Sequence, residues 1–569
     1  MIFGVLLLLL VIGGVRALYL GTFRSGALSA AAADEHVRVQ LIPAQRGEIT
    51  DRDGDPLAIS LNTDTVVADP ELTAKATPLK SAALLAPLLN IPRQMLITEL
   101  TKPDTGYVVL ARQVPAATAQ QILALNINGI NTEPSTKRVY PNGNLAGSVL
   151  GWLNQSGSGA AGLESYLNQE LRGSSGSRQV VDDAQGNAIS VTNTKTMVPG
   201  KSLKLTISVA LEAEVHQVLA QVAEEYHPAG ATAIVTNPQN GQILAIDNWP
   251  SMNPNHITEA DVTGTDGRIA ADEDMAVQYA YEPGSTFKPI TVGSALQDGV
   301  ITPSTQIGVP PELVIGQDTI TDAEDHGYES LTPGEILAVS SNIGADEIGQ
   351  RLGVSRFYPW IGRFGFGKPT GVQLPGQSDG IVQPYNQYLT DPTLMYNSPF
   401  GQGESVTAMQ MVQAYDAIAN GGILRSPQII ESVGGRAVAQ EHGRRVFSAT
   451  VAAELRNMMR GVFADGGTAS GAAIPGYDLA GKTGTAQVSV DGKYSDTLYN
   501  GSFIGMVPAS NPKLVVAVVL AGVNNGYGAT VAAPAFRKIV AWAVQHMGIN
   551  PCPKPCPASA YSAPTSNSQ

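Results

Sequence analysis

The amino-acid sequence predicts an α+β protein built on a mainly antiparallel sheet flanked by helices. Three observations support this fold class: a strand hairpin early in the long C-terminal region, a block of capped helices in its middle, and further strand patterns near its end. Strands followed by helices and then by strands again favour helices packed on an antiparallel sheet. At 569 residues, the chain is also too long for one ordinary domain.

The N-terminus is apolar but short for a membrane span. Residues 1–15 form an apolar run that Arg16 interrupts, whereas a spanning helix needs about 20 apolar residues. A signal peptide cleaved at residues 31–33 is an alternative, but that site lies far beyond the run. The basic residues follow the run, and by the positive-inside rule alone they would leave most of the chain in the cytoplasm. Residues 21–35 are Ala-rich, which is typical of a linker.

Two folded regions and a tail follow. Residues 36–200 contain strand-like and helical pieces but no catalytic constellation. Residues 203–546 begin with a helix over 211–226 and then two strands joined at an Asn-Gly turn, a strong hairpin signal. Residues 547–569 are rich in Pro, Ser and Ala, and we expect them to be disordered.

Composition excludes several classes of function. The net charge is −14 and no long basic run occurs, so we expect no nucleic-acid partner. The seven histidines show no metal-ligand spacing and no Gly-rich phosphate loop is present, so we expect neither metal nor cofactor. The two cysteines, Cys552 and Cys556, lie in the tail, which fits an exported protein without core disulfides. They form either a small terminal loop or two free thiols.

The first candidate catalytic motif is Ser285-Thr286-Phe287-Lys288. A serine hydroxyl needs a nearby base to act as a nucleophile, and on a helix the i, i+3 spacing places Ser285 and Lys288 on one face. Pro283-Gly284 indicates that Ser285 lies where a loop leads into a helix, whose free N–H groups favour a developing oxyanion. Lys288 must be partly neutral to accept a proton, which requires burial or a second cation such as Lys482.

The second motif is Ser340-Ser341-Asn342. The preceding segment Thr332–Glu335 predicts a helix start, with Thr at the cap, Pro at the first position and Glu three residues after the cap. The motif then falls at the end of that helix or in the following turn. Ser340 is a candidate proton relay and Asn342 a candidate ligand for a substrate amide. Taken alone, the motif also fits local turn capping.

The third motif, Lys482-Thr483-Gly484-Thr485, lies on a segment that alternates in the manner of a strand, and two more strands are predicted over 502–507 and 514–520. Gly484 permits close approach of a ligand, and an edge strand here would pair with an extended peptide. Lys482, Thr483 and Thr485 are candidates to hold a terminal carboxylate. A second S-x-x-K pattern at Ser510–Lys513 lies on a turn, so we discard it.

In this order, the motifs S-x-x-K, S-x-N and K-T-G are the signature of penicillin-interacting serine acyltransferases. The chain resembles a class B penicillin-binding protein over almost its whole length. Arg46–Gly54 is similar to the R-G-x-I-x-D-R-x-G opening of that family's N-terminal domain, and Arg138–Gly143 and Gly162–Glu164 resemble later landmarks. Tyr281–Lys288 is similar to the active-serine block, and Gly401–Gln410 to the segment G-x-G-x-x-V-T-x-x-Q.

The resemblance implies a serine β-lactamase-like transpeptidase domain over residues 203–546 and an elongated α+β pedestal or dimerisation domain over 36–200. It also implies a single-pass membrane anchor over residues 1–20, with the catalytic domain on the extracytoplasmic side. For that orientation we expect a short basic segment before Met1.

The implied activity is that of a D,D-transpeptidase that cross-links peptidoglycan in the cell-division branch and is acylated by β-lactams. Ser285 would attack the D-Ala-D-Ala carbonyl of a stem peptide, with Lys288 as base. Ser340, Asn342 and Lys482 would move protons and bind substrate, and the backbone N–H groups of Ser285 and Thr485 would form the oxyanion hole. A membrane glycan polymerase and division proteins are the implied partners.

Two alternatives remain. A D,D-carboxypeptidase, a β-lactamase or a β-lactam sensor of the same fold would share the three motifs and differ in whether water or an amine accepts the acyl group. The large N-terminal domain with its Arg46–Gly54 block favours the transpeptidase. A division scaffold with a vestigial site is the third hypothesis, although all the expected catalytic residues are present.

Overall fold

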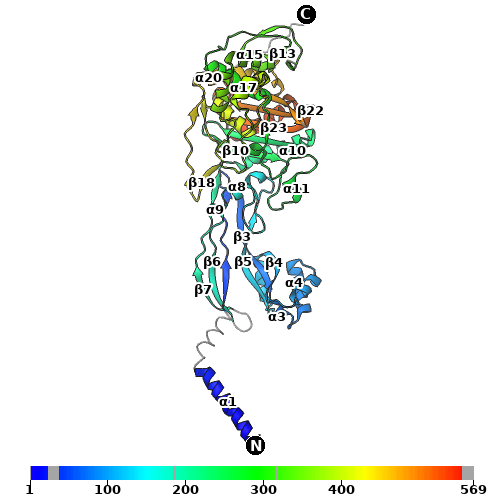
Figure 1. Cartoon of the computed structure of the whole chain (residues 1–569), viewed down its shortest axis with the longest axis vertical. Coiled ribbons are helices and arrows are strands. Elements are labelled where there is room, and N and C mark those ends of the chain that lie inside the picture. The colour runs from blue at the N-terminus through cyan, green and yellow to red at the C-terminus, as the bar shows by residue number, and fades with distance from the viewer. Residues whose placement is uncertain are drawn as a thin grey trace. The chain divides into compact units, whose positions relative to one another are not determined.

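A computed structural model describes residues 2–22, 37–182, 188–315, 318–490, 492–553 and 556. Their contacts divide the chain into two compact units (Figure 1). The first unit comprises Met1–Glu48, Ile59–Val139 and Gln169–Lys201, and the second comprises Ile49–Ala58, Tyr140–Asn168 and Ser202–Gln569. The two units therefore alternate along the sequence.

The N-terminal helix α1 covers Ile2–Thr22. Within the described part of the chain, no helix combines the length and the apolar character that crossing a membrane requires. The anchor expected over residues 1–20 is thus not shown. Residues 23–35 of the expected linker lie outside the described residues.

The first unit contains two antiparallel arrangements of strands. One is a sheet of β1 (Val37–Ile42), β6 (Gly176–Asp182) and β7 (Ala188–Lys195). In the other, β3 (Pro56–Ala68) pairs with β4 (Val108–Pro115) and β5 (Ile130–Val139). Leu85, Leu96 and Ile122 belong to a buried core beside these strands, and they come from α4 (Pro78–Leu89), α5 (Arg93–Leu100) and α6 (Ala116–Ala124).

The second unit is built on a five-stranded antiparallel sheet in the order β10-β9-β23-β22-β21. Its strands are β9 (Gly230–Asn237), β10 (Gln242–Trp249), β21 (Ala480–Val490), β22 (Lys493–Val507) and β23 (Leu514–Asn524). The predicted hairpin and the three predicted C-terminal strands are confirmed, although β22 begins at Lys493 rather than at Ser502. The strand that carries the K-T-G motif lies at the edge of the sheet.

Helices cover both faces of this sheet. On one face, α10 (Val209–Tyr226) and α22 (Ala533–His546) share a buried cluster with Val235 of β9. Thr236 points to the opposite face because side chains alternate along a strand. There its Oγ1 donates to Asp416 Oδ1 at 2.7 Å in α19 (Ala408–Ala419). The predicted α+β architecture is confirmed.

Shorter elements complete the second unit and carry most of the site. The helices are α7 (Gly147–Leu150), α8 (Gly162–Tyr166), α11 (Glu259–Thr263), α12 (Met275–Gln278), η1 (Gly284–Phe287), α13 (Lys288–Gln297), α14 (Pro333–Val339), α15 (Asn342–Leu352), α16 (Val354–Arg363), α17 (Tyr385–Thr390), α18 (Pro392–Asn397) and α20 (Ala449–Met459). The short strands include β8 (Leu203–Leu205), β11 (Ala280–Tyr281), β12 (Ile307–Val309), β13 (Leu313–Ile315), β14 (Asp318–Ile320), β15 (Glu329–Leu331) and β16 (Val406–Thr407).

The two cysteines of the tail, Cys552 and Cys556, form a disulfide. The sequence left open either a small disulfide-closed loop or two free thiols, and the structure shows the disulfide-closed loop. Residues 557–569 of the tail lie outside the described residues.

Replacing Phe536 by Ala tests the core that supports the sheet. The ring of Phe536 is fully buried, and its centroid lies 4.6 Å from that of Phe503. We expect the substitution to lower the free energy of unfolding of the second unit by about 3–5 kcal/mol, because a large cavity replaces the ring. Urea unfolding followed by circular dichroism measures the change. The control Leu389→Ala removes a side chain that is 61% exposed and should stay within about 0.5 kcal/mol; equal effects would contradict the packing account.

Candidate active site

Ser285 lies in η1, a single turn that leads directly into α13. This confirms the predicted position where a loop leads into a helix. Gly284 has φ +54°, a conformation that favours glycine, and its N–H donates to Gly401 O at 2.9 Å. The next residue, Thr286, is held at both ends, since its hydroxyl donates to Pro283 O at 2.7 Å and its carbonyl accepts from Tyr415 at 2.8 Å. The turn that carries Ser285 is therefore fixed on both sides.

Ser285 is half-buried and lines a cavity of about 350 Å³. The lining comes from η1, from β14 and the residue after it, from the start of α15, from the end of α18 and the segment after it, and from β21 and β22. The residues are Gly284, Ser285, Thr319, Ile320, Thr321, Asn342, Asn397, Phe400, Gln402, Thr485, Gln487 and Tyr494. One residue from each predicted motif therefore faces a single cavity.

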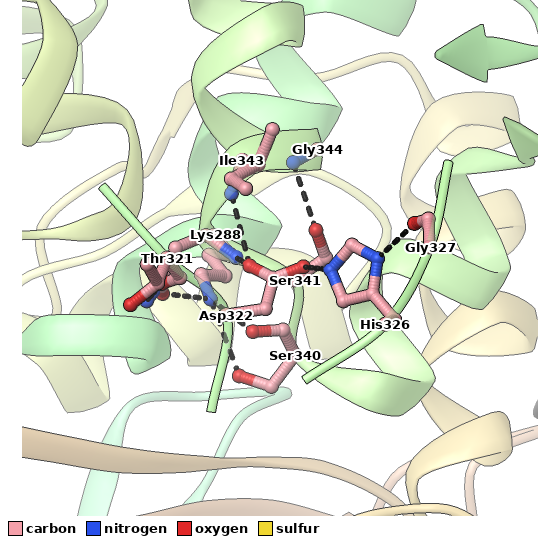
Figure 2. Close-up of polar contacts among 10 residues, drawn as sticks. Lys288, Thr321, Asp322, His326, Gly327, Ser340, Ser341, Ile343 and Gly344 are labelled. Atoms are coloured by element: carbon pink, nitrogen blue, oxygen red, sulfur yellow. Dashed lines mark hydrogen bonds and ion pairs between the residues drawn. The ribbon is translucent and has the colours of Figure 1, made fainter. Parts of the chain in front are cut away.

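Lys288 is the first residue of α13 and is fully buried. Its Nζ donates to Ser340 O at 2.5 Å, to Asn342 Oδ1 at 2.7 Å and to Ser340 Oγ at 3.3 Å (Figure 2). Among the described residues, no hydrogen bond joins Lys288 to Ser285 in this state. Burial lowers the pKa of Lys288 to about 7, against an opposing effect from the Asp322 carboxylate. This amine is therefore partly neutral near pH 7. From the sequence, this was the condition for Lys288 to accept a proton.

The second motif forms the turn between two helices. The preceding helix α14 begins with a capping box of Thr332 and Glu335, as predicted. Ser340 ends that helix in the left-handed conformation, with φ +64°, and Ser341 caps α15 by accepting from Gly344 N at 2.8 Å. This reversal turns the carbonyl of Ser340 and the side chain of Asn342 toward Lys288. The local capping and the contact with the lysine therefore occur in the same motif.

Lys482 of β21 is the second buried amine of the site. Its Nζ donates to the carbonyl and to the hydroxyl of Thr483, both at 3.2 Å. Burial and the nearby charge of Lys288 hold the pKa of Lys482 well below its usual value. A positive charge on either lysine therefore disfavours a positive charge on the other.

Gly484 lets β21 approach η1. A Cβ at this position would lie 2.3 Å from Ser502 Oγ, 2.8 Å from Thr286 Cγ2 and 3.0 Å from Pro283 O. The missing side chain at Gly484 therefore lets β21 pack against the turn that carries Ser285. The sequence had suggested only that it would let a ligand approach the strand. The following residue, Thr485, accepts through Oγ1 from Gly528 N at 3.1 Å.

Three polar residues near the cavity were not identified from the sequence. Asp322 and His326 lie in the loop before β15; Asp322 contacts the second motif, and His326 contacts Asp322 (Figure 2). Glu282 precedes η1 and accepts from Gly403 N at 2.9 Å and from Tyr494 OH at 3.0 Å. Loop residues have no periodic pattern, so only the tertiary contacts reveal them. Within the described part of the chain, no cluster of three or more His, Cys, Asp or Glu side chains could hold a metal ion.

Comparison with known proteins places this chain in a family. Residues 231–541 match the profile of the penicillin-binding protein transpeptidase domain, and residues 41–205 match the penicillin-binding protein dimerisation domain. The chain is also 32% identical to the probable peptidoglycan D,D-transpeptidase PenA of Neisseria meningitidis, over 97% of this chain and 92% of that protein. The chain belongs to the class B penicillin-binding proteins.

Other relatives agree with this membership. The peptidoglycan D,D-transpeptidase FtsI of Escherichia coli is 32% identical over 90% of this chain and 86% of its own length. A crystal structure of penicillin-binding protein 3 from Mycobacterium tuberculosis, complexed with ampicillin, superposes with a TM-score of 0.71 at 28% identity. It covers 92% of this penicillin-binding protein and 100% of that chain. The resemblance recognised from the motifs is thus confirmed.

A direct titration of Lys288 tests the electrostatics of the site. We expect the Lys288 amine to titrate near pH 7, about three units below an ordinary lysine, because burial disfavours its charged form. Carbon-13 NMR of selectively labelled lysine in the full-length protein measures the midpoint, with Lys288→Met to assign the signal. A Lys288 midpoint near 10 would contradict the burial account.

Proposed function

We propose that this protein is a peptidoglycan D,D-transpeptidase in which Ser285 is the nucleophile and Lys288 its base. The main support for this proposal is Lys288, which is fully buried and has a pKa near 7. It lies three residues after Ser285, a half-exposed serine that lines the cavity. A neutral amine in this position activates a serine hydroxyl without a histidine. The family membership supplies the substrate class, a D-Ala-D-Ala stem peptide.

Acylation begins when Ser285 Oγ attacks the penultimate carbonyl carbon of the stem peptide. A neutral Lys288 has two N–H bonds, which donate to Ser340 O and Asn342 Oδ1, so its lone pair remains to accept the serine proton. The proton then passes, through Ser340 Oγ at 3.3 Å from Lys288 Nζ, to the nitrogen of the departing D-Ala. The C–N bond breaks and an acyl-serine remains. The N–H groups of Ser285 and Thr485 are the proposed donors to the oxyanion.

Substrate binding assists this proton transfer. The terminal carboxylate of the stem peptide is proposed to lie against Lys482, Thr483 and Thr485. A negative charge there favours the ammonium form of Lys482, and that positive charge in turn favours the neutral form of Lys288. The base is then prepared when the substrate arrives.

The second half-reaction transfers the acyl group to an amine of a neighbouring stem peptide. The edge strand β21 offers unpaired backbone groups along which an extended peptide adds as a further strand. The same acyl-serine forms with a β-lactam, whose amide bond opens instead. The relatives named D,D-transpeptidases and the dimerisation-domain match favour transfer to an amine over the hydrolase alternative.

Mass spectrometry of the intact protein tests the nucleophile. After incubation with penicillin we expect one adduct per wild-type chain and none on Ser285→Ala, because the acyl bond requires that hydroxyl. The control is Ser510→Ala, which removes the exposed serine of the second S-x-x-K pattern and should leave the adduct intact. An adduct that persists on Ser285→Ala would refute the role of Ser285 as nucleophile, and its absence from folded wild type would refute the acyltransferase function. Rapid loss of the adduct would instead favour a lactamase.

Membrane attachment and association with a glycan polymerase and division proteins are further parts of the proposal. They rest on the apolar residues 1–15 and on the resemblance to the division branch of the family. We expect the full chain to sediment with membranes after expression in a bacterial host and a chain of residues 37–569 to remain in the soluble fraction. Equal distribution of the two chains would contradict an N-terminal anchor.

A further inference from the structure

The carboxylate of Asp322, which was not singled out from the sequence, holds the second motif in place. Asp322 Oδ1 accepts from the backbone N–H of Asn342 at 2.5 Å and from that of Ile343 at 3.1 Å (Figure 2). These are first-turn N–H groups of α15, which have no partner within their helix, and a negative charge is favoured at that end. Asp322 therefore fixes the backbone at the residue that contacts the catalytic lysine.

The side chain of Asn342 is held from the same segment. Its Nδ2 donates to Thr321 O at 2.9 Å, and its Oδ1 accepts from Lys288 at 2.7 Å. The carbonyl of Thr321 can only accept, so it determines which end of the amide faces the lysine. The backbone and side chain of Asn342 are thus both oriented by Thr321 and Asp322.

His326 completes the arrangement as a cation. Its Nδ1 lies 2.6 Å from Gly327 O, and its Nε2 lies 3.2 Å from Asp322 Oδ2. Both partners are acceptors, whereas a neutral imidazole has one N–H, so only the imidazolium satisfies both contacts. Burial lowers the pKa of His326, but the Gly327 bond and the charges of Asp322 and Glu329 outweigh it and raise that pKa above its usual value.

We propose that Asp322 and His326 are a pair of positioning residues that control the base of this enzyme. Asp322 holds Asn342 and places a negative charge beside Lys288, and a protonated His326 holds Asp322 and offsets that charge. The pair is shielded from solvent, with side chains 11% and 14% exposed, so salt screens it less than a surface pair. The inference rests on the proposed function, which assigns Lys288 its role.

The two substitutions should shift the titration of Lys288 in opposite directions. The Asp322 carboxylate raises the pKa of Lys288 against the effect of burial, so its removal should lower that pKa further. The positive charge of His326 is present at low pH and is lost as the pH rises through its own pKa. Removing it exposes the full charge of Asp322 and should raise the pKa of Lys288.

The other charged groups around the pair do not reverse these signs. Lys482 on β21 and Glu329 on β15 are present in every variant. Glu324 and Asp325 in the same loop are exposed, and solvent screens their charges. Asp325 therefore provides a matched control, because Asp325→Asn makes the same chemical change close in the sequence.

The experiment compares full-length wild type with Asp322→Asn, His326→Gln, the double variant and Asp325→Asn. The first readout is the Lys288 midpoint from carbon-13 NMR, and the second is the pH dependence of the rate of acylation by penicillin. We expect Asp322→Asn to lower both midpoints by roughly 0.5–1 pH unit. His326→Gln should raise them by a few tenths of a unit, the double variant should resemble Asp322→Asn, and Asp325→Asn should match wild type.

Two results would overturn the inference. One is an unchanged Lys288 midpoint in Asp322→Asn, which would leave Asp322 only a structural role in capping α15. The other is a shift of the same sign in both single variants. If thermal melting shows that Asp322→Asn is unfolded, the Lys288 midpoint of His326→Gln alone tests the inference. That variant keeps the contacts of Asp322 with the start of α15.

The two readouts also separate this inference from the proposed function. The NMR titration requires no acylation, so it tests the electrostatic control even if Ser285 proves not to be the nucleophile. Conversely, loss of the adduct in Ser285→Ala together with wild-type midpoints in both pair variants would support the function and refute the inference.

Discussion

Burial of Lys288 is the constraint on which the rest of the site depends. An ammonium group removed from water is strongly destabilised unless partners surround it. Here the amine is fully buried but meets a carbonyl, an amide oxygen and a hydroxyl from one turn of the chain. These acceptors satisfy its N–H groups without supplying a full negative charge. The lysine therefore stays hydrogen-bonded while its pKa lies near 7, which is the condition for a base at neutral pH.

That requirement explains the shape of the surrounding backbone. Ser340 adopts a left-handed conformation so that α14 can end and α15 can begin with both acceptors facing the lysine. On the other side, the glycine at position 484 removes the Cβ that would collide with Thr286 and Ser502. The edge strand and the serine turn can then lie in contact. The second and third motifs thus each contain a residue whose backbone position the packing of the site requires.

Much of the local structure was predictable from particular residues. Thr332 was recognised as a helix cap, and it forms a capping box in the structure. The alternating pattern after Lys482 was recognised as a strand, and it forms an edge of the sheet. Asp322 and Glu282 were missed because they act through contacts between residues far apart in the sequence, as Asp322 does in binding Asn342 across 20 residues. His326 was missed because it acts only through Asp322. No local pattern marks such residues.

The sequence by itself determined the chemical types of the site and their order along the chain: a serine with a lysine one turn away, a polar turn, and a lysine on a strand. It also determined which segments become helices and strands, since caps, turns and periodicity act over a few residues. Only the tertiary structure decided the protonation of the two lysines and the role of the Asp322 loop. A pKa depends on burial and on charges brought together through space, and neither exists until the chain has folded.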